Sequence, residues 1–314
     1  MKPALLMVII LWFACKPPTP EKTYNDNKIK FIETSEQVLE LLKSIDSNKF
    51  RNYSIEDTLK YRDKLSKRIY DSLGLKLWYK ADFDGNGYLD LLINASDGYS
   101  LQKIVCVLDS GNNTFKPLLV KVILGAPWDR FVFPYVAELN NKSALIVKRY
   151  NNNINFSHYS AHFTDLITDT LVYEYENFIE FNANPAEENI SKIDIVTSSC
   201  EGTCPIFSLG IDRHDATYNA TMFNRDTGKF RAVTNLKDFD RFASILNYCN
   251  FKKLDSTYAV GWTDAPGAVL TVHYNDNQIK RIKDYGQQGN YGLMAIYSEL
   301  FAFRDNQKWE KIKK

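Results

Sequence analysis

The chain has 314 residues and a mass of 36.3 kDa, which corresponds to about two domains at roughly 100–200 residues each. Apolar residues make up 45% and charged residues 25%, a composition that argues against extensive disorder, collagen-like repeats and coiled coils. With 39 Lys and Arg against 38 Asp and Glu, the net charge of +1 gives no basic field for nucleic acid and no acidic surplus for a basic partner.

The first fifteen residues have the composition of an export signal. Lys2 is the only charge before Cys15, and every residue from Ala4 to Ala14 is apolar. A basic start, a short apolar stretch and a small residue before a cleavage site are typical of secretory signals. The stretch is too short to cross a bilayer as a helix, which needs about 20 residues.

Cys15 and the Pro-rich residues 16–20 make this segment resemble a bacterial lipoprotein signal, in which the cysteine is acylated and becomes the new N-terminus. Trp12 stands where that pattern usually has Leu, and an ordinary cleaved signal with an incidental cysteine is the alternative. We therefore expect lipidation of Cys15 and a membrane-anchored protein of the bacterial cell envelope. Its folded part would lie outside the cytoplasm, at the outer membrane, where disulfides are permitted.

The segment after the expected anchor begins with a tether and two helices. Residues 16–29 have no periodic apolar positions and are expected to be flexible. Helical spacing of apolar residues predicts a helix over 34–47 and a second helix over about 55–73. Gly74 then fits the end of the second helix.

After Gly74 the apolar period changes to two, which is typical of strands. The expected strand-like segments are 75–79, 88–93, 101–108, 114–123, 131–137, 144–150, 154–162 and 171–181. Residues 182–189 carry Pro and polar side chains without apolar marks, and they form the clearest domain boundary in the chain.

The last third of the chain begins with a predicted strand at 190–196, and strands continue to about residue 233. Later predicted elements are a helix over 236–248, strands over 268–274 and 278–283, and a helix over about 291–303. The predicted fold class is α+β, with two domains that each contain a mainly antiparallel sheet and a few helices. The predicted divisions are a signal at 1–15, a tether at 16–29, a β-rich domain with a helical start at 30–182, a linker at 183–189 and an α+β domain at 190–312.

The acidic turn from Asp82 to Asp90 is the strongest chemical feature of the sequence. It places side-chain oxygens of Asp82, Asp84, Asn86 and Asp90 at positions 1, 3, 5 and 9 of a loop, and the Tyr88 carbonyl at position 7. Hard cations such as Ca²⁺ take six to eight oxygen ligands, and a Gly-bearing loop brings such positions together. The sequence therefore predicts a calcium-type site with a structural role.

This turn has two other interpretations, an EF-hand and a plain hairpin. An EF-hand is disfavoured, because Ile93 occupies position 12, where that motif requires a bidentate Glu. A plain hairpin is the simpler alternative, because Asn86-Gly87 is a strong two-residue turn sequence and the aspartates would then only cap it.

The segment from Asp82 to Ile93, followed by Val107 to Pro117, resembles one FG-GAP/VCBS repeat. The resemblance implies that the Asp-x-Asp-Gly-Asn-Gly loop binds calcium, with Asp82, Asp84, Asn86 and Asp90 as ligands. A second segment, from Tyr135 to Val147, resembles the repeat more weakly and lacks most of these ligands. Because propellers typically need four to eight blades, one good and one decayed copy predict a small sheet with a helical start instead of a closed ring.

The cysteines beyond the anchor divide into two groups. Cys106 and Cys249 lie at apolar positions of a predicted strand and a predicted helix, so we expect them in the core. Cys200 and Cys204 would lie about 13 Å apart in a straight strand, whereas a disulfide requires Cα atoms about 4.4–6.8 Å apart. Gly202 permits the necessary turn, so a local disulfide is expected.

The last third of the chain resembles the DUF6438 domain family over about residues 190–310. The resemblance is carried by Cys200-x-Gly-x-Cys204-Pro, Tyr218, Thr263-Asp264-x-Pro and Asp284-Tyr285-Gly. It implies a fold but no reaction. Asp264, Asp284 and Tyr285 either line a pocket or serve to cap turns.

The sequence is compatible with two functions. The first is a lipid-anchored binding or structural module, for which no catalytic or cofactor-binding residue is assigned and the protein or glycan partner is left open. The second is a surface hydrolase that uses Asp264 and Asp284 as acid and base beside Tyr285. That mechanism requires the two carboxylates to converge at about 5–9.5 Å in one cleft.

Overall fold

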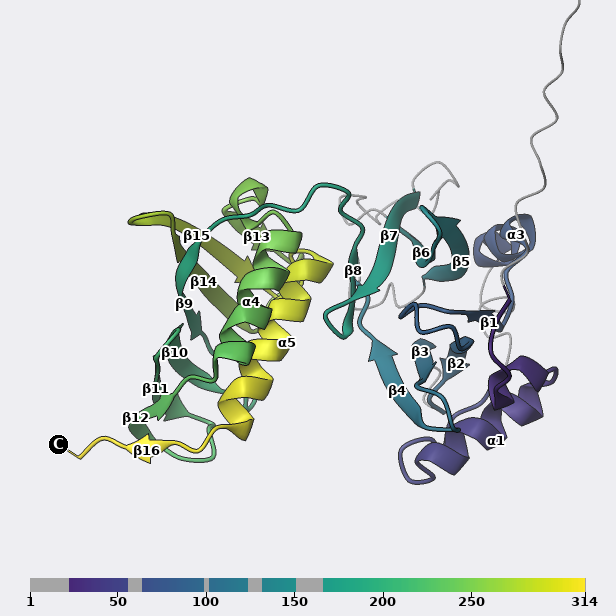
Figure 1. Ribbon diagram of the computed structural model, residues 1–314, viewed down its shortest axis with the longest axis horizontal. Helices are drawn as coiled ribbons and strands as arrows, with labels where there is room; N and C mark the ends of the chain where they lie inside the picture. Colours follow the sequence, from purple (N-terminus) through teal and green to yellow (C-terminus); the bar gives the residue numbers. More distant parts are fainter. Residues whose placement is uncertain (1–22, 56–63, 99–101, 124–131, 151–165, 314) are drawn as a thin grey trace, which may run out of the picture.

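The computed structural model describes residues 23–55, 64–98, 102–123, 132–150 and 166–313. The predicted signal and residues 16–22 of the expected tether lie outside these residues. The rest of the expected tether, residues 23–29, packs onto the fold, with Asn27 and Ile29 buried. Within the described ranges, every helix is too short or too polar to span a membrane. The architecture is α+β, as predicted, and consists of two four-stranded sheets, one eight-stranded sheet and the helices that pack against them (Figure 1).

The N-terminal helical region contains the 3-10 helix η1 (Lys28–Phe31), α1 (Ser35–Ile45) and α3 (Lys64–Leu73). A capping box starts α1, because the Thr34 side chain accepts the Gln37 N–H while the Gln37 side chain accepts the Thr34 N–H. The prediction of this helix is confirmed. The expected helix over 55–73 corresponds to α3, and its residues 56–63 lie outside the described ones.

Two antiparallel meanders follow, each with its four strands in chain order. The strands of the first sheet are β1 (Trp78–Ala81), β2 (Asp90–Ser96), β3 (Gln102–Asp109) and β4 (Phe115–Val120). Those of the second sheet are β5 (Phe133–Leu139), β6 (Lys142–Tyr150), β7 (Leu166–Glu174) and β8 (Asn177–Glu180). The strand expected at 154–162 lies outside the described residues.

The segment 171–181, expected as one strand, instead turns back on itself between β7 and β8. Tyr175 and Glu176 form the turn with φ of 50° and 60°. Such a two-residue hairpin with both residues in the left-handed region is normally built from Asn and Gly. The Tyr-Glu pair therefore gave no turn signal in the sequence, and tertiary contacts determine the turn.

The two meanders pack in layers. One face of the first sheet packs against η1 and α1 through Leu91, Ile93 and Val105, in a cluster with Leu41 and Leu42 of α1. Its other face packs against the second sheet in a separate buried cluster. That cluster joins Leu92, Ile104, Cys106 and Leu108 to Leu145, Val147, Leu171 and Phe178. Cys106 is therefore a core residue, as predicted.

The C-terminal sheet has the strand order β13-β15-β14-β9-β10-β11-β12-β16, and β13–β15 is its parallel pair. Its first strands are β9 (Ile190–Thr197), β10 (Ile206–Asp212), β11 (Asp215–Met222) and β12 (Gly228–Val233). The later ones are β13 (Thr257–Ala259), β14 (Gly267–Tyr274), β15 (Gln278–Tyr285) and β16 (Glu310–Lys311). The helices are α4 (Leu236–Tyr248), the 3-10 helix η3 (Phe251–Lys253) and α5 (Tyr291–Asn306).

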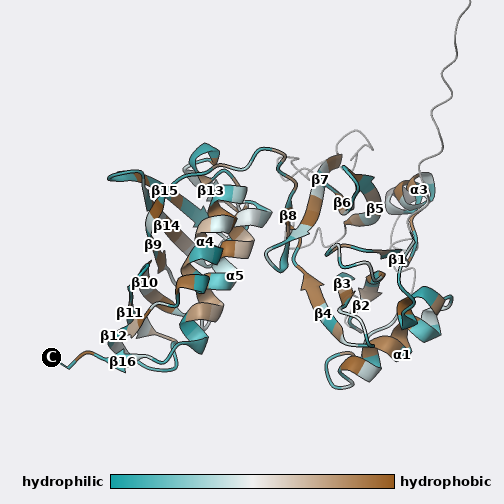
Figure 2. Ribbon diagram, in the orientation of Figure 1, coloured by the Kyte–Doolittle hydropathy of each residue, from teal (hydrophilic) through white to brown (hydrophobic). Residues whose placement is uncertain are grey.

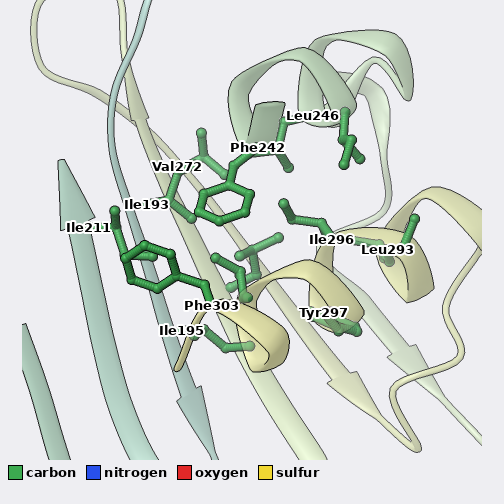
Figure 3. Close-up of a cluster of buried hydrophobic side chains, with 14 of the residues drawn as sticks. Ile193, Ile195, Ile211, Phe242, Leu246, Val272, Leu293, Ile296, Tyr297 and Phe303 are labelled. Atoms are coloured by element: carbon green, nitrogen blue, oxygen red, sulfur yellow. The ribbon is translucent and has the colours of Figure 1, made fainter. Parts of the chain in front are cut away.

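Helices α4 and α5 cover one face of this sheet (Figure 1). Alternate residues of its strands are buried, as expected for a sheet covered on one side. In Figure 2, β14 of this sheet and β4 and β7 of the two N-terminal sheets are among the most hydrophobic segments. Figure 3 shows Ile193, Ile195, Ile211 and Val272 of the strands pointing toward Phe242 of α4 and Phe303 of α5. Each such side chain contributes about 1.5–3 kcal/mol when fully buried.

Helix α5 lies between the two halves of the molecule. Leu293, Ile296 and Leu300 belong to the core of the eight-stranded sheet. Tyr291 and Met294 instead belong to the cluster formed by the two four-stranded sheets. A helix that is apolar on most sides is buried on most sides, and α5 therefore joins the C-terminal part to the N-terminal part.

Candidate functional site

The acidic loop connects β1 to β2, and the Asp82 carboxylate organises it. Asp82 Oδ1 accepts the N–H groups of Gly85 at 2.8 Å and Asn86 at 3.1 Å, and its Oδ2 accepts that of Gly87 at 3.0 Å. Both glycines have positive φ, 75° and 86°, which other residues rarely adopt. The loop therefore closes tightly around one carboxylate.

Asp90 is the first residue of β2, and its side chain is fully buried. Its Oδ2 accepts the Phe83 N–H at 2.8 Å, and its Oδ1 accepts the Asp109 N–H at 2.9 Å. Burial raises the pKa of Asp90 to about 7, against these two hydrogen bonds and with a further contribution from the charges of Asp84 and Asp82. The protein leaves this carboxylate poorly compensated.

Three carboxylates meet in the loop. Asp82, Asp84 and Asp90 each offer an oxygen atom, and these atoms lie within 4.8 Å of one another. Asp84 is exposed, Asp82 is half-buried and Asp90 is buried, so the group extends from solvent into the protein. Desolvation, aided by the neighbouring charge of Asp82, also raises the pKa of Asp84. A divalent cation held by these oxygens would relieve the repulsion.

The other two predicted ligands are placed differently. Asn86 Oδ1 accepts the Tyr88 N–H at 2.8 Å, and Asn86 Nδ2 donates to Asp84 Oδ2 at 3.0 Å. The Asn86 side-chain oxygen is therefore already hydrogen-bonded within the loop. The Asn86 side-chain NH₂ group donates to Asp84, which is itself a predicted ligand. The structure brings together the three aspartates, while ligation by Asn86 and by the Tyr88 carbonyl stays a prediction.

Asp109 belongs to the same site and was missed by sequence reasoning. It is the last residue of β3 and lies 19 residues from Asp90, outside the acidic loop that the sequence pattern marks. Its side chain is fully buried, its N–H donates to Asp90, and its carbonyl accepts Asn86 Nδ2 at 2.8 Å. Asp109 Oδ1 accepts the Gly111 N–H at 2.8 Å, while Oδ2 has no hydrogen-bond partner among the described residues.

The acidic loop borders a cavity of about 360 Å³. Asp82 and Asp84 line one side, and Asn141, Tyr173 and Glu174 of the second sheet line the other. An ion at the three carboxylates would thus be reached from solvent between the two meanders.

The disulfide predicted between Cys200 and Cys204 is present, with a Cα–Cα distance of 5.7 Å. It closes the connection between β9 and β10, and Gly202 turns the chain there with a φ of 121°. The Glu201 N–H donates to the Asp264 carbonyl at 3.1 Å, which ties this loop to the segment before β14.

The three positions considered for a pocket differ in their surroundings. Asp284 is buried, and its carboxylate accepts the N–H groups of Gln288 at 3.2 Å and Gly289 at 2.9 Å. Asp264 is exposed with a φ of 62°. Adjacent residues of a strand point to opposite faces, so Tyr285 points away from Asp284 and instead accepts the Ala265 N–H at 3.1 Å. This geometry favours turn capping.

Comparison with known proteins gives one match. Residues 191–304, from β9 to near the end of α5, match a domain family described as a domain of unknown function, DUF6438. No curated protein matches the chain, and no solved structure matches it. The DUF6438 domain includes the disulfide and the Asp284 turn but not the acidic loop.

Proposed function

We propose that the protein is an extracytoplasmic binding or structural module whose acidic loop holds one divalent cation of the calcium type. The observation that carries this proposal is the convergence of Asp82, Asp84 and Asp90 within 4.8 Å, with Asp90 completely buried. A buried carboxylate is normally paired with a positive charge, and no such partner of Asp90 is found among the described residues.

Calcium suits this loop because hard oxygen ligands, an irregular shape and partial solvent access are typical of its sites. Magnesium demands a more regular octahedron and keeps its waters. Affinities in the range of about 10⁻⁴–10⁻³ M are common for extracellular modules.

The cation would have a structural role. Asp90 and Asn86 both bind the backbone of Asp109, so the acidic loop is already attached to the turn after β3. An ion that holds Asp82, Asp84 and Asp90 together would stiffen this attachment and, through it, the first meander. The resemblance of this loop to an FG-GAP/VCBS repeat stays a prediction.

We also propose that Cys15 is lipidated and anchors the module to the bacterial envelope. Support comes from the apolar stretch before Cys15 and from the Pro-rich residues 16–20 after it. Cys15 lies outside the described residues. The disulfide between Cys200 and Cys204 is in keeping with an oxidising compartment.

Thermal unfolding of the full chain with calcium and with a chelator tests the cation site. Calcium at about 100 times its Kd should stabilise the protein by about 2.7 kcal/mol, and Asp84→Asn should remove most of this gain. Asp84 is the best choice, because it is exposed and makes the fewest bonds to the loop backbone.

Asp212→Asn is the matched control. Asp212 also accepts two backbone N–H groups in a turn, those of His214 and Asp215 at 2.8 Å, but it lies in the β10–β11 hairpin. This variant should retain the full calcium response. Identical melting curves of the wild type in calcium and in chelator, with no bound metal by mass analysis, would refute the cation site and favour the interpretation as an ordinary hairpin.

A further inference from the structure

A groove runs between β4 and α5, where the first meander meets the DUF6438 domain. Its larger part is a cavity of about 570 Å³, and a smaller cavity of about 180 Å³ continues it. The two parts share Leu119, Lys121, Met294 and Ser298. The Lys121 ammonium donates to Ser298 Oγ at 2.6 Å and thereby divides the groove. Ligand pockets commonly lie at such domain interfaces and have volumes of about 300–1,000 Å³.

The walls of this groove are apolar with a positive rim. Ile104 and Leu119 line it from the first sheet, and Trp262, Met294 and Phe301 line it from the C-terminal domain. Its uncharged polar side chains are glutamines, two tyrosines, a serine and an asparagine. Among the described lining residues of both cavities there are two lysines and no Asp or Glu, although the chain as a whole has nearly equal numbers of acids and bases.

Lys121 differs from the other cations along this interface. Lys116 of β4, five residues before Lys121, pairs with Glu176 at 2.6 Å, and Arg241 also pairs with Glu176 at 3.0 Å. Lys103, at the far rim, pairs with Asp97 at 3.2 Å. Lys121 contacts only a hydroxyl, and in the described part of the chain no carboxylate lies within ion-pair distance of it. The side chain is exposed, yet the protein around its ammonium lowers the pKa of Lys121 by desolvation.

We propose that this groove binds a small amphipathic anion, with its apolar body against Trp262, Leu119 and Phe301 and its charged group on Lys121. The ammonium would exchange the neutral Ser298 hydroxyl for an ionised acceptor, which adds the attraction between two opposite charges to the hydrogen bond. Carboxylates and phosphates share the required chemistry. The groove is distinct from the acidic loop, so this proposal does not depend on cation binding.

Calorimetric titration of the full chain with three ten-carbon probes tests the proposal. Decanoate and decyl phosphate carry the anionic group, and decanol is their neutral counterpart. We expect at least one anion to bind and decanol to bind at least tenfold more weakly than that anion. The comparison of the two anions shows which headgroup the site prefers. A change in tryptophan emission on probe binding that is absent in Trp262→Phe would place the probe in the groove.

Variants of the two lysines on this side of the interface separate the site from nonspecific attraction. Lys121→Met should abolish the preference for the anion over decanol, and Lys121→Arg should restore it. Lys116→Met removes a charge five residues earlier in the chain and should keep the wild-type preference, because Lys116 already has an acidic partner. Absence of binding by both anions, equal binding of decanol, or an unchanged preference in Lys121→Met would each overturn the proposal.

Discussion

Gly286 explains at the level of one residue why the Asp284-Tyr285-Gly286 motif is a turn. Gly286 has a φ of 102°, and a Cβ atom there would lie 2.4 Å from Val260 Cγ1. Its N–H donates to the Pro266 carbonyl at 2.8 Å, while the Asp284 carboxylate holds the next turn through Gln288 and Gly289. The motif thus forms the turn that connects β15 to α5.

Gly286→Ala should therefore destabilise the protein by about 2 kcal/mol or more, since it adds a steric clash to the cost of a positive φ. Gly202→Ala is the matched control, because Gly202 has a φ of 121° but open space around its Cβ position. Chemical denaturation measures both changes. An equal loss of stability in the two variants would show that the contact with Val260 has no importance.

The N-terminus of α5 shows how one element joins the two halves of the protein. Glu180, at the end of β8, accepts the N–H groups of Tyr291 at 2.7 Å and Gly292 at 2.9 Å. Asn290 caps the same helix by accepting the Leu293 N–H. A negative charge at a helix N-terminus is favourable, but burial of Glu180 outweighs this effect and raises its pKa above the ordinary value of 4.5.

The raised pKa fixes the sign of a pH effect. Glu180 binds its proton more tightly in the folded protein, so its stabilising contribution is complete below pH 4.5 and is lost as the pH rises through the raised pKa. Glu180→Gln cannot titrate and should not show this loss. The free energy of unfolding of the wild type, minus that of the variant, should therefore decrease as the pH rises from 4.5. Parallel pH profiles of the two proteins would contradict this expectation.

At the scale of the whole molecule, the chain forms successive layers from the N-terminal helices to the eight-stranded sheet (Figure 1). The DUF6438 match begins at residue 191, so Glu180 and both meanders lie outside it. The DUF6438 domain therefore depends on a neighbouring part of the chain to complete the N-terminus of α5. The groove also exists only where the two parts meet.

The proposed lipid anchor at Cys15 would determine where the whole molecule lies relative to the membrane. Residues 16–22, which precede the first described residue, would let the folded part lie up to about 25 Å from the lipid surface when fully extended. Cys15→Ser should move the protein from the membrane fraction to the soluble envelope fraction without a change in its melting temperature. Fractionation and intact mass measurement check this outcome. An unacylated wild-type chain found inside the cell would refute the anchor.

Features that depend on residues close together in sequence were predictable. The helix at α1, the alternating strands, the Cys200–Cys204 disulfide and the three aspartates of the acidic loop follow from periodicity, capping and turn chemistry. The likeness to DUF6438 was predicted on its motifs and is confirmed over residues 191–304. Local interactions span only a few residues, so the sequence expresses them directly.

The sequence by itself determined the α+β class, the turn-forming loops and the types of ligand atom that the chain offers. Only the tertiary structure decided that Tyr175 and Glu176 form a turn, that Asp109 joins Asp90, and that Lys121 meets a hydroxyl instead of a carboxylate. The physical reason is distance along the chain. Lys121 and Ser298 are 177 residues apart, and packing of the layers brings such residues together, which no local pattern encodes.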